Sequence, residues 1–288
     1  MGEQDATGPI RLSVVIPAFN EAGYLPATLD SLHRQDFAGS WEIIVVDNNS
    51  TDDTAAIARA HGARVLVENR PGVCAARQLG TEHARGQIVV STDADTVHPA
   101  DWLTRLDARF RSDPAAVAVA GPCRYAEPLW WAVVFPRLWF AAVGVVHALV
   151  DKVFYVTATN IAFLASDFPG YDTTLTQGGD EFDILRRLRG RGRVVWDRHN
   201  AVVTSSRRMD QGLAYTLFVS FGYHYGFAYL RNRLSSRRIP AVAPPIRREH
   251  AGLVRRRRRR WLAGLAVVAS VLTALARHRR TITITPSD

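Results

Sequence analysis

The chain has 288 residues, 47% of them hydrophobic and 22% charged, which excludes a globally disordered protein. Its two cysteines are too few for a disulfide framework and lack the spacing of a zinc site. The net charge of +9 comes from the arginine-rich tail from residue 247 onward, so the rest of the chain is near neutral and we expect no nucleic-acid partner.

Strand-like and helix-like patterns alternate along the first 120 residues. Five runs rich in β-branched residues predict strands at 11–17, 43–46, 64–67, 88–91 and 117–120. The segments between them predict four helices. The first includes Leu25–Leu32, the second begins after a cap at Ser50 or Thr51, and the last two cover 73–84 and 100–111. This alternation predicts parallel strands with right-handed crossovers, and the continuous apolar runs indicate a sheet covered on both faces.

Two carboxylates follow the predicted strand at 88–91. Asp93 and Asp95 point the same way if the backbone there is extended. In open α/β sheets, ligands bind at the carboxyl ends of the strands. An acid pair at that position favours a hard divalent cation that bridges protein and phosphate. Asp-x-Asp is also common in turns and helix caps, so its interpretation depends on the rest of the chain.

The predicted sheet lacks the glycine-rich phosphate loops of common nucleotide-binding proteins. No GxGxxG follows the first strand and no GxxxxGK[ST] occurs, which argues against dinucleotide redox and P-loop enzymes. Acids follow the strand ends instead: Glu21, Asp47, Asp93 and Asp95. Because acids repel bare phosphates, hydroxyls, a base edge or a metal ion are the better partners.

Five segments together carry a family pattern. They are VVIPAFNE at 14–21, VVDNNSTDDT at 45–54, GVCAARQLG at 72–80, DAD at 93–95 and GGDEFDILRRL at 178–188. In order and spacing they resemble family 2 glycosyltransferases. The resemblance implies a GT-A fold over residues 10–205, an α/β Rossmann-like, mostly parallel sheet with helices on both faces. Apolar helices are expected in addition toward the C-terminus.

The resemblance implies a donor site for a nucleotide-diphosphate sugar. Asp47 would bind the nucleobase, and the nucleoside pocket would be lined by Pro17, Ala18 and Glu21. Where the family often has Asn, this chain has Gln78, an exchange that we expect to be tolerated.

The resemblance also assigns the diphosphate end of the donor. Asp93 would approach the ribose, and Asp95 would coordinate Mg²⁺ or Mn²⁺. Arg77 would lie near the base and the diphosphate, although it also fits a solvated helix arginine. His199 is a second metal-ligand candidate, although a lone histidine is more often structural. Residues 205–208 would contact phosphates or form a polar turn.

The acidic segment at 178–188 supplies the candidate general base. Its acids, Asp180 and Glu181, stand in the reverse of the family order, and alignment on Asp183 favours Glu181 as the base. All three also fit ordinary acids in the first turn of a helix, where the helix dipole favours them. We expect the first two to be catalytic and Asp183 to be structural.

These residues suit glycosyl transfer by direct displacement with inversion. The reaction needs a base for the acceptor hydroxyl, neutralisation of the leaving diphosphate and an aligned donor. The chain lacks the QxxRW motif of processive synthases in this family, so we expect transfer of a single sugar. The alternatives are a retaining transferase or a nucleotidyltransferase on the same fold, and a non-catalytic membrane scaffold.

Apolar segments outside the core predict membrane attachment. Residues 129–150 read as an amphipathic or broken helix on a membrane or over the acceptor site, or as a buried core helix. We expect residues 206–250 to form an aromatic, membrane-interfacial segment. Residues 251–288 hold six consecutive arginines and predict an apolar anchor helix at 261–276. That helix would be about 24 Å long, against roughly 30 Å for a bilayer core.

The location of the enzyme follows from these segments. Because the N-terminus shows no signal-peptide pattern, we expect the catalytic domain on the cytoplasmic side of the cell membrane. The arginines suit an anionic membrane surface. We therefore expect a lipid-linked or glycan acceptor, as in the synthesis of cell-envelope glycans.

Overall fold

The computed structural model describes residues 9–126, 130–175 and 180–207. These all lie in the first of two units of the chain, Met1–Ala243 and Pro244–Asp288. The strands are β1 (Leu12–Ala18), β2 (Trp41–Asp47), β3 (Arg64–Val67), β4 (Ile88–Ser91), β5 (Thr96–Val97), β6 (Ala116–Ala120), β7 (Cys123–Ala126), β8 (Ile161–Leu164), β9 (Arg193–Trp196) and β10 (Val202–Ser205). The helices are α1 (Leu25–His33), α2 (Thr54–Ala60), α3 (Val73–Glu82), α4 (Trp102–Ser112), α5 (Trp130–Val150), the 3₁₀ turn η1 (Ala165–Asp167) and α6 (Asp180–Arg189).

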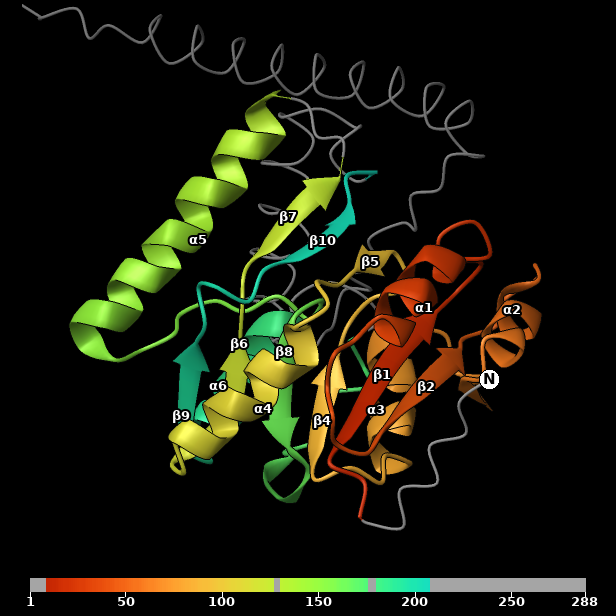
Figure 1. Cartoon of the computed structure of the whole chain (residues 1–288), viewed down its shortest axis with the longest axis horizontal. Helices are drawn as coiled ribbons and strands as arrows, with labels where there is room; N and C mark the ends of the chain where they lie inside the picture. The colour runs from red at the N-terminus through yellow and green to blue at the C-terminus, as the bar shows by residue number, and fades with distance from the viewer. Residues whose placement is uncertain (1–8, 127–129, 176–179, 208–288) are drawn as a thin grey trace, which may run out of the picture. The chain divides into compact units, whose positions relative to one another are not determined.

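A seven-stranded sheet forms the centre of the described unit (Figure 1). Its strand order is β3-β2-β1-β4-β8-β6-β9, and only β8 runs antiparallel to its neighbours. The predicted mostly parallel α/β sheet is therefore confirmed. A second sheet, β5-β10-β7, was not predicted from the sequence, because a two-residue strand such as β5 carries no periodicity.

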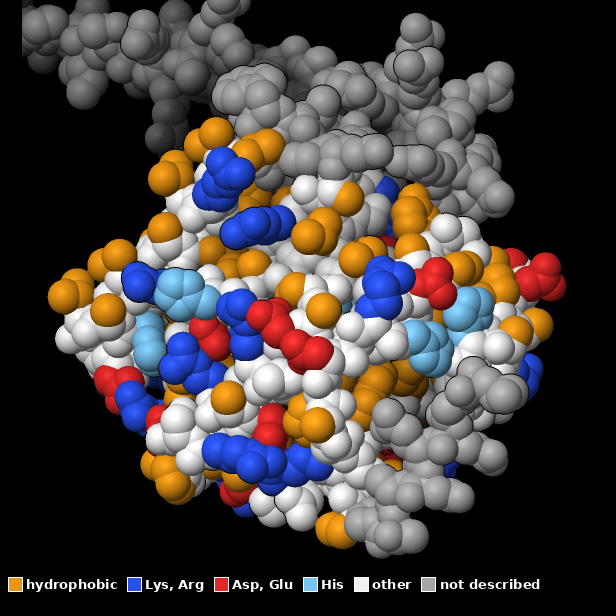
Figure 2. Space-filling view, viewed as in Figure 1, with side chains coloured by type: hydrophobic (Ala, Val, Ile, Leu, Met, Phe, Trp, Pro, Cys, Tyr) orange, Lys and Arg blue, Asp and Glu red, His pale blue; other side chains and the backbone are white. Residues whose placement is uncertain are grey.

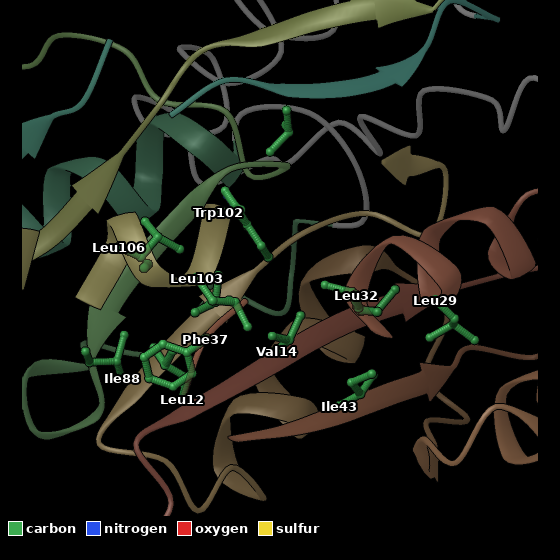
Figure 3. Close-up of a cluster of buried hydrophobic side chains, with 14 of the residues drawn as sticks. Leu12, Val14, Leu29, Leu32, Phe37, Ile43, Ile88, Trp102, Leu103 and Leu106 are labelled. Atoms are coloured by element: carbon green, nitrogen blue, oxygen red, sulfur yellow. The ribbon is translucent and has the colours of Figure 1, made fainter. Parts of the chain in front are cut away.

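The sheet has a hydrophobic core on each face. Leu12, Val14 and Ile16 of β1 are fully buried in a core that also holds side chains of α1 and α4 (Figure 3). Val15 of the same strand packs in the other core, with side chains of α3 and α6. Because alternate residues of a strand point to opposite faces, this division confirms that helices cover both faces.

The start of α2 differs from the sequence prediction. The helix begins at Thr54, and the Asp52 carboxylate accepts the Thr54 N–H at 3.1 Å, so neither Ser50 nor Thr51 caps it. These two residues contact the loop after β1 instead. The Ser50 hydroxyl accepts the Asn20 N–H at 2.8 Å, and the Asn20 side chain accepts the Thr51 N–H at 2.6 Å. The predicted cap was wrong because its residues join two loops at the sheet edge.

Helix α5 runs without a break through Pro136, and most of its surface is exposed. One stripe is packed: Val143 is buried, and the Phe140 ring stacks on Trp196 at 5.7 Å. Elsewhere Leu138 and Leu149 are 67% and 77% exposed. Figure 2 shows hydrophobic side chains gathered along the margin where α5 lies in Figure 1. The interpretations of this segment as a broken helix or a buried core helix were therefore wrong.

By length and composition, residues 133–150 of α5 are apolar enough to cross a membrane, with 11% of that segment buried. Of the predicted segment 206–250, all but the first two residues lie outside the described residues, as does the whole of 251–288 with its anchor helix at 261–276. The boundaries predicted for the three parts of the chain stay predictions.

Gly86, two residues before β4, allows the backbone there to pack closely against the start of β1. A Cβ atom there would lie 2.6 Å from the Ser13 nitrogen and 2.7 Å from the Leu12 carbonyl carbon. We expect Gly86→Ala to lower the free energy of unfolding by about 1–3 kcal/mol, the usual cost of overpacking. Gly23→Ala is the control, since nothing lies within 4 Å of its Cβ position. Equal urea midpoints for the two variants would contradict this reading.

Candidate active site

The predicted nucleoside residues lie together at the carboxyl ends of β1 and β2. Ala18 and Asp47 are register partners on these neighbouring strands, and Pro17 precedes Ala18. The Asn48 N–H donates to the Ala18 carbonyl at 2.8 Å, and the Asp47 carboxylate accepts the Ser50 N–H at 3.2 Å. Hydrogen bonds thus hold the loop that follows Asp47 against the end of β1, with the Asp47 carboxylate at the same edge of the sheet. The role of Asp47 toward a nucleobase stays a prediction.

Arg77 of α3 joins two of the predicted acids. Its Nη2 contacts Asp93 Oδ1 and its Nη1 contacts Asp180 Oδ2, both at 2.6 Å. The Arg77 side chain is 4% exposed, so its interpretation as a solvated helix arginine was wrong. Burial alone would lower the pKa of Arg77, but the charges of Asp93 and Asp180 raise it above its ordinary value. The guanidinium is therefore a permanent cation that holds the β4 end against the start of α6.

Asp93 is anchored on both carboxylate oxygens. Besides its contact with Arg77, it accepts the Thr159 hydroxyl at 2.6 Å through Oδ2. These contacts fix the carboxylate at the edge of the sheet, and its side chain keeps 31% exposure. Thr159 was not among the predicted site residues because no motif contains it. Its place follows only from the antiparallel pairing of β8 with β4.

Asp180 and Glu181 begin α6 but have different surroundings. Asp180 is buried and paired with Arg77. The Oε2 atom of Glu181 is buried and has no hydrogen-bond partner among the described residues. Burial raises the pKa of Glu181 well above its usual range, and the negative charge of the adjacent Asp180 carboxylate raises it further. Of the two acids, Glu181 is thus the one whose surroundings favour the protonated form. The next acid, Asp183, pairs with Arg186 at 2.9 Å.

Asp95 lies in a third group, with two residues from other parts of the chain. Its Oδ2 lies 3.0 Å from Nη2 of Arg207, and its Oδ1 accepts the Thr204 hydroxyl at 3.2 Å. Arg207 also contacts both carboxylate oxygens of Glu21, at 2.7 and 2.8 Å. Glu21, which was predicted to line the nucleoside pocket, and Asp95, the predicted metal ligand, therefore contact the same guanidinium group, that of Arg207.

His199 lies in a different environment from Asp95. Its side chain is exposed and its Nε2 accepts a hydrogen bond from Arg198 at 2.9 Å, while its carbonyl accepts one from Arg105 of α4. In the described parts of the chain, no group of three or more His, Cys, Asp or Glu side chains is arranged to hold a metal. None of these contacts links His199 to Asp95, and its role as a metal ligand stays a prediction.

Residues 13–163 match the family model of glycosyl transferase family 2, more than half of the chain. The chain belongs to glycosyl transferase family 2. The family 2 domain is 40% identical over 135 residues to an uncharacterised glycosyltransferase of Mycobacterium tuberculosis, a match that covers 47% of this chain and 56% of that one. The chain thus spans about half the length of these curated relatives.

Two further similarities concern the same domain. An undecaprenyl-phosphate 4-deoxy-4-formamido-L-arabinose transferase of Salmonella choleraesuis is 30% identical over 114 residues, 36% of this chain and 35% of that one. The mannosyltransferase of Pyrobaculum calidifontis, solved in complex with GDP-Man and Mn²⁺, has a TM-score of 0.59 at 21% identity, over 81% of this chain and 68% of that one. The latter likeness shows that the family 2 domain has the expected GT-A fold.

Proposed function

We propose that this chain transfers a single sugar from a nucleotide-diphosphate sugar to an acceptor hydroxyl or phosphate, with inversion. The main observation behind this proposal is that Arg77 links two groups of acids at one edge of the sheet: Asp93 after β4, and the acids at the start of α6. Asp93 belongs to the end that we assign to the donor, and Asp180 and Glu181 to the end that we assign to the acceptor. Direct displacement needs these two functions close together but on separate groups.

Glu181 is the proposed general base. In the displacement, the acceptor oxygen forms a bond to the anomeric carbon while the bond from that carbon to the diphosphate oxygen breaks. The bonding electron pair leaves with the diphosphate, and the proton of a hydroxyl acceptor, or of a phosphate acceptor bound in its protonated form, moves to Glu181. Asp180 suits this role less well, because its carboxylate is held by the Arg77 cation. Arg77 joins Asp180 to Asp93, with contacts of 2.6 Å to each carboxylate.

The residues at Asp95 fit a divalent cation. A carboxylate oxygen is the ligand that Mg²⁺ and Mn²⁺ prefer, and two carboxylates, Asp95 and Glu21, are gathered here around Arg207. Asp95 would hold the metal, which would supply Lewis-acid neutralisation of the leaving diphosphate. Asp47, Pro17 and Ala18 would hold the nucleoside beside it. The structure of a relative with GDP-Man and Mn²⁺ supports this assignment at the level of the fold.

We infer a lipid-linked acceptor and a location at the cytoplasmic face of the membrane. The exposed apolar surface of α5 supports a membrane contact, because Leu138, Val145 and Leu149 are each more than half exposed on one helix. Large exposed apolar patches mark interaction sites for proteins or membranes. The relative named for undecaprenyl phosphate supports the same acceptor class. The arginine run at 255–260 would add attraction to anionic lipid.

A transfer assay with the full chain tests this proposal. The enzyme would be mixed with radiolabelled nucleotide sugars, Mn²⁺ and vesicles that contain a polyprenyl phosphate. We expect label to move into the organic phase from one donor. Vesicles without polyprenyl phosphate are the control for non-specific partition. Transfer to a soluble acceptor alone would contradict the lipid-linked acceptor, and no transfer from any donor would favour a membrane scaffold.

A further inference from the structure

Arg207 follows β10 and belongs to none of the five motif segments, yet it lies at the centre of an ionic group with Glu21 and Asp95. The pairing of β10 with β5 sets Thr204 opposite Thr96 and brings the next residues beside Asp95. The Ser205 N–H donates to the Asp95 carbonyl at 3.2 Å. Arg207 therefore reaches Asp95 because of the second sheet, although 112 positions separate the two residues in the chain.

The two carboxylates hold Arg207 unequally. Glu21 takes both terminal nitrogens, at 2.7 and 2.8 Å, in the paired geometry that makes arginine–carboxylate bonds strong. The contact with Asp95 is longer: its Oδ2 lies 3.0 Å from Nη2, the nitrogen that Glu21 holds at 2.7 Å. The guanidinium also lies over the Tyr24 ring, 4.7 Å from its centroid. Arg207 can thus lose Asp95 and remain held by Glu21 and Tyr24 at the same edge of the sheet.

Burial strengthens the case that Arg207 is a fixed charge. Its side chain is 15% exposed, and those of Glu21 and Asp95 are 11% and 10% exposed. Burial alone would lower the pKa of Arg207, but hydrogen bonds to Glu21 and the charges of both acids raise it above its ordinary value. With both acids ionised, Glu21, Asp95 and Arg207 together have a formal charge of −1. The Arg207 guanidinium lies at Asp95 Oδ2, an oxygen that could otherwise bind a metal.

We propose that Arg207 is an internal competitor of the divalent cation for Asp95, released when the donor diphosphate arrives with the metal. This inference rests on the proposed function. A divalent cation alone changes the formal charge of the group from −1 to +1 and places two cations against one carboxylate. A diphosphate that brings about two negative charges cancels this excess and offers the displaced guanidinium an anionic partner. Metal and diphosphate binding should therefore be coupled, and each should strengthen the other.

The test measures Mn²⁺ binding by electron paramagnetic resonance, without nucleotide. We expect Arg207→Gln to bind Mn²⁺ about tenfold more tightly than the wild type, within the ~5–150-fold range of site couplings. The same variant should bind UDP or GDP more weakly in the presence of Mn²⁺, because the diphosphate loses its guanidinium. Arg207→Lys should lie between the two proteins, since an ammonium keeps the charge but cannot span both acids.

Three controls make the result specific. Arg111→Gln removes an exposed arginine that pairs with Asp107, and should leave Mn²⁺ affinity unchanged. Adding Asp95→Asn to Arg207→Gln should abolish the gain, which locates the metal at Asp95. Thermal melting of each variant reports whether the fold is intact, and Arg207→Lys serves if Arg207→Gln unfolds.

The outcomes separate this inference from the proposed function. Unchanged or weaker Mn²⁺ binding in folded Arg207→Gln, with normal nucleotide binding by the wild type, would overturn the competition and leave the transferase standing. Nucleotide binding without Mn²⁺ binding in either protein would show that Asp95 is not a metal ligand, which also overturns the competition. A wild type that binds no nucleoside diphosphate would instead overturn the proposed function.

Discussion

Replacing Glu181 by Gln should lower kcat by about 10²–10⁴-fold, the usual contribution of a positioned general base. The amide keeps the size of the side chain but cannot accept the acceptor proton. Donor affinity should change little, because Glu181 stands at the acceptor end of the site. The measurement is initial rate against donor and acceptor concentration. Asp183→Asn is the matched control, since Asp183 lies on the same helix turn but pairs with Arg186.

The pH dependence of the activity also tests whether Glu181 is the general base. A general base acts in its ionised form, and the pKa of Glu181 is raised well above its usual range. Activity should therefore rise with pH through this raised pKa, so that the acid limb of kcat/KM lies above that of an ordinary glutamate. The limb should disappear in Glu181→Gln. A limb that persists in Glu181→Gln and vanishes in Asp180→Asn would assign the base to Asp180 instead.

Replacing Arg77 by Met should lower the free energy of unfolding by about 3–5 kcal/mol, the usual cost of removing one partner from a buried ion pair. Met fills a similar volume but leaves Asp180, 5% exposed, with no cation at that position. Urea unfolding curves would give the change. Arg111→Met is the control, because Arg111 is 71% exposed and such surface pairs contribute about 0–1 kcal/mol.

A double-mutant cycle identifies the origin of that loss. If the cost comes from the uncompensated acid, adding Asp180→Asn to Arg77→Met should recover part of the lost stability. Additive losses in the two single variants would show that Arg77 acts through packing alone. The cycle also bears on function, because Arg77→Met should raise the pKa of Glu181 further by removing a cation that lowers it.

The parallel part of the sheet was predictable because its signals are local. The runs before Asp47 and Asp93 are buried strands that end in acids, and these acids lie at the predicted edge. Helix α5 was harder, because an apolar segment with Pro136 has the same composition whether it faces a core or lipid. Only its packing shows that one stripe is covered and the rest is exposed.

The ionic contacts of the site were not predictable from the sequence. Arg77 contacts both Asp93 and Asp180, which are 87 positions apart in the sequence. No pattern in either segment predicts that the two acids lie close together. Arg207 reaches Asp95 through a pairing with β5, a strand too short to show a period. Its one sequence signal was its place in a polar segment after a predicted strand, which fitted a phosphate contact or a turn equally well.

The most direct test of the central claim is a donor screen with the purified protein. UDP-, GDP- and dTDP-sugars would be offered with Mn²⁺ or Mg²⁺, and release of nucleoside diphosphate would be followed over time. We predict slow, metal-dependent release from one donor that is abolished in Asp95→Ala and retained in Arg111→Gln. Folded protein that binds and cleaves none of these donors with metal present would contradict the assignment as a nucleotide-sugar transferase.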